Sequence, residues 1–167
     1  MACHCETFSP GDVVGILEKL GLTLALAESC TGGMIAAKIT GIPGSSRYFS
    51  GGVVAYSNLV KEKVLGVSVQ ELSSFGAVSE EVALSMAIGI KKLVRTSIGL
   101  SVTGIAGPGG GTQEKPVGLV YIALDGPWGS VCSEMRLKGD RSEVRTAATI
   151  ASLEFLYSYL KDNSNKH

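Results

Sequence analysis

The sequence predicts an α/β fold built on a mixed sheet. Apolar runs with strand character alternate with stretches that carry apolar residues at helical spacing, which is typical of an α/β layer. Near the C-terminus, two strand-like runs are joined by the turn sequence Asp125–Gly129, so at least that pair is antiparallel. The length of 167 residues suffices for one well-buried core and is short for two. We therefore expect a single domain over residues 1–167.

The N-terminal half is predicted to alternate helices and strands. Ser9 and Pro10 start a helix whose apolar stripe ends at Gly21, because Ser is a good N-cap, Pro fits the first turn and Gly stops a helix. The elements that follow are a strand over about 22–27, a short helix to Thr40, a strand over 51–56, a helix from Ser57 or Asn58 to Gly66, and a helical connector over 69–75.

The C-terminal half is predicted to supply the rest of the sheet. Ser79 begins a longer helix with a buried apolar stripe. Strands are expected over 98–103, 117–124 and 130–137, and the pattern Asp140-Arg-Ser-Glu143 resembles a capping box at the start of the last helix. Residues 1–8 and 163–167 are expected to be flexible tails.

Composition excludes several classes of partner. Fifteen Lys and Arg balance fifteen Asp and Glu, and no basic cluster stands out, so neither nucleic acid nor an anionic membrane surface is indicated. No apolar run reaches the length of a membrane span, and the N-terminus lacks the features of a signal peptide. We expect a cytoplasmic protein that acts on a small molecule. Sparse charge and a positive mean hydropathy favour a homo-oligomer.

The stretch Glu28–Gly33 has the pattern of a strand–turn–helix elbow. An apolar run precedes it and a small-residue helical pattern follows. Such an elbow lifts one side chain above the sheet, which makes Ser29 the candidate nucleophile. The N–H groups of the turn residues would stand at a helix N-terminus and could hold an oxyanion. These turn residues are Cys30, Thr31, Gly32 and Gly33.

A lysine is the candidate base for Ser29. The two histidines, His4 and His167, lie at the chain ends, so a Ser-His-Asp site and a histidine-rich metal site are both disfavoured. A desolvated lysine has a lowered pKa and can act as a base near neutral pH. Lys61 is best placed, just after the strand that ends at Tyr56, while Lys38 and Lys63 are competitors.

The cysteines offer weaker alternatives. Cys30 is a rival nucleophile beside Ser29, although no histidine is at hand to ionise it. The spacing Cys3-His4-Cys5 is not that of a known zinc knuckle, and no second pair follows it. We therefore expect a reduced N-terminal tail and no metal site.

A glycine-rich loop, Gly104–Gly111, follows the strand over 98–103. So many glycines let the backbone approach a ligand closely, and their N–H groups could cradle a phosphate. The loop has the spacing of neither a P-loop nor a dinucleotide-binding fold, and a plain flexible hairpin loop is the alternative. Arg141 and Arg145, near the start of the last helix, either reach an anion or are solvated.

Several motifs, taken together, resemble the C-terminal domain of the competence/damage-inducible protein CinA. The resemblance covers about residues 9 to 160. The motifs are Leu26–Gly33, Gly44–Ser46, Val54–Asn58 with Lys61, Gly76–Ser79, Thr103–Pro108, Gly110-Gly111, Glu114–Gly118 and Gly139–Arg141. Their common order makes a chance match improbable.

The resemblance implies a fold and an activity. The implied fold is a three-layer α/β/α sandwich with a mixed, mostly parallel central sheet of about five to six strands. The implied activity is hydrolysis of the carboxamide of nicotinamide mononucleotide (NMN), with Ser29 as nucleophile, Lys61 as general base and Tyr56 orienting Ser29 or relaying a proton. No metal or organic cofactor is required.

The expected substrate site extends beyond these three residues. Its members are Glu28, Ser46, Thr103, Gly104, Gly107, Gly109, Gly110 and Arg141. Glu28 could hold Lys61, hold the ring amide or only bond the turn. The 5′-phosphate is assigned to the glycine-rich loop, with Arg141 as a second contact. The competing class is a non-catalytic nucleotide-binding or assembly domain, because a fold does not establish an activity.

Overall fold

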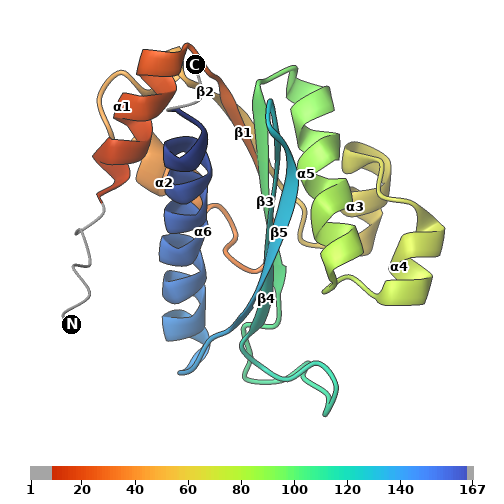
Figure 1. Cartoon of the computed structure of the whole chain (residues 1–167). Helices are drawn as coiled ribbons and strands as arrows, with labels where there is room; N and C mark the ends of the chain where they lie inside the picture. Colours follow the sequence, from red (N-terminus) through yellow and green to blue (C-terminus); the bar gives the residue numbers. More distant parts are fainter. Residues whose placement is uncertain (1–8, 165–167) are drawn as a thin grey trace.

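The computed structural model describes residues 9–164 and contains a mixed five-stranded sheet between two layers of helices (Figure 1). The strands are β1 (Leu24–Glu28), β2 (Phe49–Val54), β3 (Ile98–Gly104), β4 (Leu119–Gly126) and β5 (Gly129–Arg136). The helices are α1 (Pro10–Leu20), α2 (Met34–Thr40), α3 (Asn58–Leu65), α4 (Val69–Phe75), α5 (Glu80–Val94) and α6 (Arg141–Ser164), with a 3₁₀ turn, η1, over Ser45–Arg47. The predicted α/β sandwich is confirmed.

The strand order β2-β1-β3-β4-β5 brings three strand ends to one edge. β1 pairs in parallel with both β2 and β3, while β4 is antiparallel to β3 and to β5. β4 alone therefore runs against the other strands, so the sheet is mixed and mostly parallel as predicted. The carboxyl ends of β1, β2 and β3 lie at the lower edge of the sheet in Figure 1. Open α/β sheets bind ligands at the carboxyl ends of their strands.

The second strand begins and ends two residues earlier than predicted. It covers Phe49–Val54, and Tyr56 lies beyond its end instead of on it. Gly51 and Gly52, where the sequence predicts its start, lie inside the strand, because the backbones of β2 and β1 approach closely there. A Cβ on Gly52 would lie 3.0 Å from the carbonyl oxygen of Leu26. A close-packed glycine within a strand was thus mistaken for a strand boundary.

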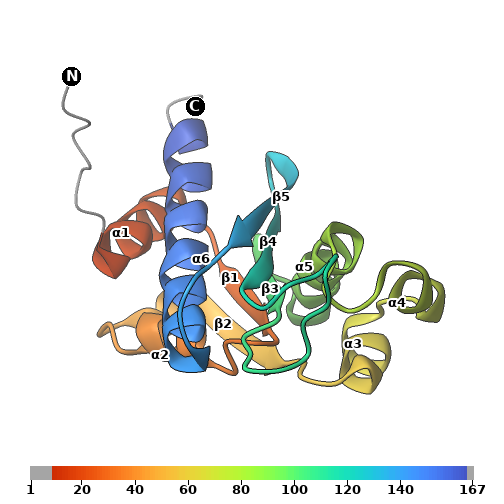
Figure 2. The ribbon, with the colours of Figure 1, turned by 90° about the horizontal axis from the view of Figure 1, so that it is seen from below.

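Helices cover both faces of the sheet. α1, α2 and α6 lie on one face, and α3, α4 and α5 on the other, as Figure 2 shows from below. No helix within residues 9–164 has both the length and the apolar character needed to cross a membrane.

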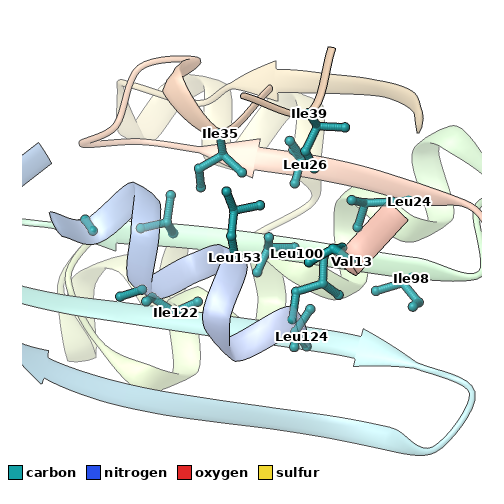
Figure 3. Close-up of a cluster of buried hydrophobic side chains, with 14 of the residues drawn as sticks. Val13, Leu24, Leu26, Ile35, Ile39, Ile98, Leu100, Ile122, Leu124 and Leu153 are labelled. Carbon is teal, nitrogen blue, oxygen red and sulfur yellow. The ribbon is translucent and has the colours of Figure 1, made fainter. Parts of the chain in front are cut away.

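Side chains along β1 point alternately to the two faces of the sheet, so the core is divided between the two helix layers. Leu24 and Leu26 pack with Leu153 of α6 in the large cluster drawn in Figure 3, whereas Ala25 and Ala27 face α5. Small residues on the α5 side bring that helix close to the sheet, and the hydroxyl of Ser101 donates to the carbonyl of Ala83 at 2.6 Å. The rigid, two-sided core fixes the strand ends on which the site is built.

Candidate active site

A cavity of about 210 Å³ opens at the carboxyl ends of β1, β2 and β3. Ser29 directly follows β1, and its N–H extends the ladder by donating to Val102 of β3 at 3.0 Å. Ala55 directly follows β2 and donates to the carbonyl of Glu28 at 2.7 Å. The lining residues are Ser29, Cys30, Tyr56, Asn58, Lys61, Ala77, Val78, Thr103, Gly104, Ala106 and Arg141.

Ser29 and Lys61 form a buried pair in this cavity. The Nζ of Lys61 lies 3.1 Å from the Oγ of Ser29 and 2.7 Å from the carbonyl oxygen of Ala55. Ser29 is 8% exposed and Lys61 is 1% exposed. Ser57 caps the helix that carries Lys61 by accepting from the N–H of Val60 at 3.3 Å. The tight turn from β2 into α3 thus brings the lysine back over the end of β1.

Burial sets the electrostatics of Lys61. Desolvation lowers the pKa of its ammonium from 10.5, and the charge of a Cys30 thiolate would oppose that shift. A lowered pKa raises the fraction of neutral amine, and a neutral amine can accept the hydroxyl proton of Ser29. The other two candidates are exposed: Lys38 on α2, and Lys63, which pairs with Glu62 at 2.6 Å. Within residues 9–164, only Lys61 has its ammonium in hydrogen-bond reach of Ser29.

Glu28 stabilises the elbow and does not face the cavity. The residue is 2% exposed. Its carboxylate accepts hydrogen bonds from the hydroxyl of Thr31 and from the N–H groups of Gly33, Ile35 and Ala36. Of the three roles expected for Glu28, these contacts show the last, bonding of the turn, and its assignment to the substrate site is wrong. The carboxylate of Glu28 thus occupies the N-terminus of α2, where the helix dipole favours negative charge.

The expected oxyanion hole is smaller than predicted. The N–H of Gly33 is bonded to Glu28 at 2.9 Å, and the N–H of Gly32 donates to the carbonyl of Ser29 at 3.1 Å. These two groups are engaged, so their assignment as oxyanion donors is wrong. The N–H groups of Cys30 and Thr31 stay as candidates.

The thiol of Cys30 lies beside those two N–H groups. Burial raises the pKa of Cys30 to about 11, against the opposing effect of the N–H groups of Cys30 and Thr31. The thiol is therefore protonated near neutral pH, and a protonated thiol is a poor nucleophile. This disfavours Cys30 as the rival of Ser29.

Arg145 of α6 binds the elbow, whereas the sequence leaves open whether it reaches an anion or is solvated. Its Nε donates to the carbonyl of Cys30 and its Nη2 to the carbonyl of Thr31, each at 3.0 Å. The signal that could have found it is the spacing from Arg141. Residues four apart on a helix share a face, and the capping pattern at Asp140 fixes where that helix begins.

Tyr56 contacts Arg141 instead of Ser29. Its hydroxyl accepts from the Nη2 of Arg141 at 2.7 Å, and its side chain is 59% exposed at the mouth of the cavity. The expectation that the hydroxyl orients Ser29 is therefore not met, and the alternative role of Tyr56 as a proton relay stays a prediction. Arg141 also donates through Nη1 to the carbonyl of Gly107 at 2.7 Å. It thereby joins the glycine-rich loop to the β2–α3 connection.

Thr103 and Gly104 line the cavity at the end of β3, as expected. The hydroxyl of Thr103 donates to the carbonyl of Ala77 at 2.8 Å, which leaves its oxygen as an acceptor. Gly104 is required by packing, because a Cβ there would lie 2.7 Å from a methyl of Val120.

A second hollow of about 660 Å³ adjoins the first at Ala106 and Arg141. It is lined further by Pro108, Val117, Gly139, Asp140, Ser142 and Arg145. Gly109 and Gly110 are exposed and line neither hollow, so the loop glycines contribute less than expected. Lys115 anchors the far end of the loop by donating to the carbonyls of Val78, at 2.7 Å, and Phe75.

Ser46 lies away from the site. It belongs to η1, which precedes the start of β2, whereas Ser29 follows the end of β1. Because β1 and β2 are parallel, these positions stand at opposite ends of the sheet. Its assignment to the substrate site is wrong. The Cys3-His4-Cys5 segment is outside the described residues, and no group of three metal-ligating side chains occurs within residues 9–164.

Comparison with known proteins gives the family. The model of the CinA C-terminal domain matches residues 8–160, and the chain belongs to this family. A Halothermothrix orenii protein named as competence-damage inducible is 54% identical over 157 residues, which are 93% of this chain and 38% of that protein. A CinA-like protein of Kosmotoga olearia is 53% identical over 144 residues, 86% of this chain and 35% of that protein. The chain thus spans little more than a third of these relatives.

Solved structures share the fold over nearly their whole length. The competence/damage inducible protein CihA from Agrobacterium tumefaciens superposes with a TM-score of 0.83 at 43% identity, covering 93% of this chain and 99% of that one. A CinA superfamily protein from Enterobacter cloacae gives a TM-score of 0.89 at 30% identity, covering 96% and 97%.

Proposed function

We propose that this chain hydrolyses the carboxamide of NMN to nicotinate mononucleotide and ammonia, with Ser29 as nucleophile and Lys61 as general base. The observation that carries the proposal is the buried Lys61 ammonium, 3.1 Å from the hydroxyl of Ser29. Lys61 pairs with no carboxylate among the residues that the structure describes, and a lysine desolvated beside a serine on a sharp turn has the arrangement of a Ser–Lys hydrolase. Membership of the CinA family agrees with it, although the relatives' names specify no reaction.

The mechanism uses two side chains, two backbone N–H groups and water. Neutral Lys61 takes the proton of Ser29 as Oγ bonds to the amide carbon, and the N–H groups of Cys30 and Thr31 stabilise the oxyanion. The intermediate collapses, the C–N bond breaks, and the protonated Lys61 returns its proton to the departing ammonia. Water then attacks the acyl carbon as Lys61 takes its proton. The ester C–O bond breaks, protonated Lys61 returns the proton to Oγ of Ser29, and the carboxylic acid leaves and ionises.

The two adjoining hollows suggest how the nucleotide lies. The smaller one, which holds Ser29 and Lys61, suits the carboxamide ring. The ribose phosphate then extends past Ala106 into the larger hollow, where the guanidinium of Arg141 can bind the phosphate. Gly109 and Gly110 line neither hollow. We therefore assign the phosphate contact mainly to Arg141 and not to the N–H groups of the loop glycines.

Ammonia release from NMN by the purified chain tests the proposal. We expect turnover by the wild type and its loss in Ser29→Ala and Lys61→Met, while Lys63→Met, which changes an exposed lysine on the same helix, keeps full activity. Undiminished release by Ser29→Ala would refute the mechanism. Binding of NMN without any ammonia release by the wild type would favour the non-catalytic alternative.

A further inference from the structure

We infer that Arg145 is a positioning residue for Ser29, acting through the backbone of the elbow. The consequence for catalysis rests on the proposed function, whereas the effect on the reactivity of Ser29 does not. Arg145 lies one turn into α6, and its guanidinium spans two successive carbonyls of a segment more than a hundred residues away. A planar fork of donors suits such a pair of acceptors, and a lysine could reach them only as a single point charge.

Arg145 supplies the main hydrogen bonds to two carbonyls of the elbow. The carbonyl of Ser29 accepts from the N–H of Gly32, but the carbonyl of Cys30 has its hydrogen bond from Arg145. The carbonyl of Thr31 has Arg145 at 3.0 Å and, besides that, only a long contact of 3.4 Å from the N–H of Met34. Without the guanidinium, two polar groups at the nucleophile's turn lose their main partner, and the turn gains freedom to reorient.

The bond to Cys30 also orients a candidate oxyanion donor. The carbonyl of Cys30 and the N–H of Thr31 belong to one planar trans peptide, in which they point in opposite directions. Fixing the carbonyl toward α6 therefore fixes the direction of the Thr31 N–H. Glu28 restrains the same turn through the Thr31 hydroxyl and the Gly33 N–H. The elbow is thus held between an anion and a cation that belong to different elements.

Arg145 has no acidic partner that would explain its place. Within residues 9–164, no carboxylate lies within ion-pair distance of its guanidinium. Arg145 also lines the larger hollow, so direct binding of a substrate anion is the rival role. The two roles differ in what they change. Positioning alters the reactivity of Ser29 toward any electrophile, whereas anion binding alters affinity for NMN.

The test compares Arg145→Gln and Arg145→Lys with the wild type, and Arg136→Lys on exposed β5 is the matched control. An uncharged fluorophosphonate probe reports the reactivity of Ser29, because Oγ attacks phosphorus and displaces fluoride. Mass spectrometry identifies the labelled residue, with Ser29→Ala as the blank. The second readout is kcat and KM for NMN, and thermal unfolding confirms that each variant is folded.

We expect Arg145→Gln to slow labelling and to lower kcat by about 10- to 100-fold, since small misplacement of reacting groups has effects of this size. KM should change less than about threefold, and Arg145→Lys should recover part of the labelling rate. Arg136→Lys should behave as the wild type. If Arg145→Gln does not fold, the labelling rate of Arg145→Lys decides.

Three results would overturn the inference. One is labelling as fast in the Arg145 variants as in the wild type. Another is no labelling of Ser29 in any of the proteins, the wild type included. The third is a raised KM for NMN at unchanged kcat, which would make Arg145 a substrate-binding residue. A wild type that is labelled at Ser29 but releases no ammonia would refute the proposed function alone, because the comparison of labelling rates would still test Arg145.

Discussion

The Nζ of Lys61 lies 3.1 Å from the Oγ of Ser29, and neither side chain has more than a small fraction of its surface in contact with water. The other hydrogen-bond partner of this ammonium is the carbonyl of Ala55, a neutral group. Burial therefore acts on Lys61 with little compensation from opposite charge, and desolvation favours the neutral amine. The pair combines a hydroxyl to be deprotonated with a base that is partly ready to take the proton.

The first prediction concerns the pH dependence of NMN hydrolysis. Only the neutral amine of Lys61 accepts a proton, so kcat/KM should rise with pH through the pKa of Lys61. Because burial lowers that pKa, the midpoint of the rise should fall below 10.5. Initial rates of ammonia release between pH 6 and 10 measure it. A rate that does not depend on pH over this range would contradict the assignment of Lys61 as base.

The second prediction concerns thiol reagents. The pKa of Cys30 is raised to about 11 and that of Cys132 to about 12, in both cases mainly by burial, so both thiols are protonated at neutral pH. Treatment with iodoacetamide at pH 7.5 should leave ammonia release unchanged, and Cys30→Ser should keep most of it. Rapid inactivation with alkylation of Cys30, found by peptide mass mapping, would return Cys30 to consideration as nucleophile.

The Ser29–Lys61 pairing could be predicted because both residues follow local rules. An apolar run that breaks into polar and glycine residues marks a strand end, and a capped helix after the next strand returns to the same edge. With histidine confined to the chain ends, lysine was the remaining base. Sequence pattern and sheet topology therefore combine to place these two side chains together.

The surroundings of the pair could not be predicted in the same way. Arg145 and Tyr56 take their partners from segments 114 and 85 residues distant, and no local pattern encodes which carbonyl or hydroxyl they meet. Three roles stayed open for Glu28, because a carboxylate next to a nucleophile has the same sequence whether it turns toward the cavity or under the helix. Ser46 was misread because membership in a shared motif carries no information about which end of the sheet a residue occupies.

The third prediction concerns Glu28 as a structural anion. Glu28→Gln replaces one carboxylate oxygen by an amide nitrogen, which cannot accept from the donors of the turn and of α2. The free energy of unfolding should fall by about 2 to 3 kcal/mol, the usual cost of leaving buried groups unpaired. Urea denaturation measures it, with Glu62→Gln on α3 as control, because the carboxylate of Glu62 pairs with the exposed ammonium of Lys63. An unchanged stability would show that the carboxylate does not hold the elbow.

The fourth prediction concerns the close approach of α5 to the sheet. A Cβ on Gly99 would overlap the carbonyl oxygen of Ala87 and would also lie 3.0 Å from the Cβ of Lys91, so α5 must move away from β3. Overpacking of this kind lowers the free energy of unfolding by about 1 to 3 kcal/mol. Because Ala83 and Ala87 of α5 also pack on Ala123 of β4, the displacement should spread along the layer.

Gly15→Ala is the matched control for Gly99→Ala. Gly15 lies within α1, and a Cβ there would meet no atom within 4 Å, so alanine fits without any shift. Alanine in a helix interior is more favourable than glycine by about 0.5 to 1 kcal/mol. Urea denaturation should therefore show a lower free energy of unfolding for Gly99→Ala and a higher one for Gly15→Ala. If both substitutions changed the free energy of unfolding equally, the contact between α5 and β3 would not be tight. The spacing between α5 and the sheet would then tolerate a methyl group.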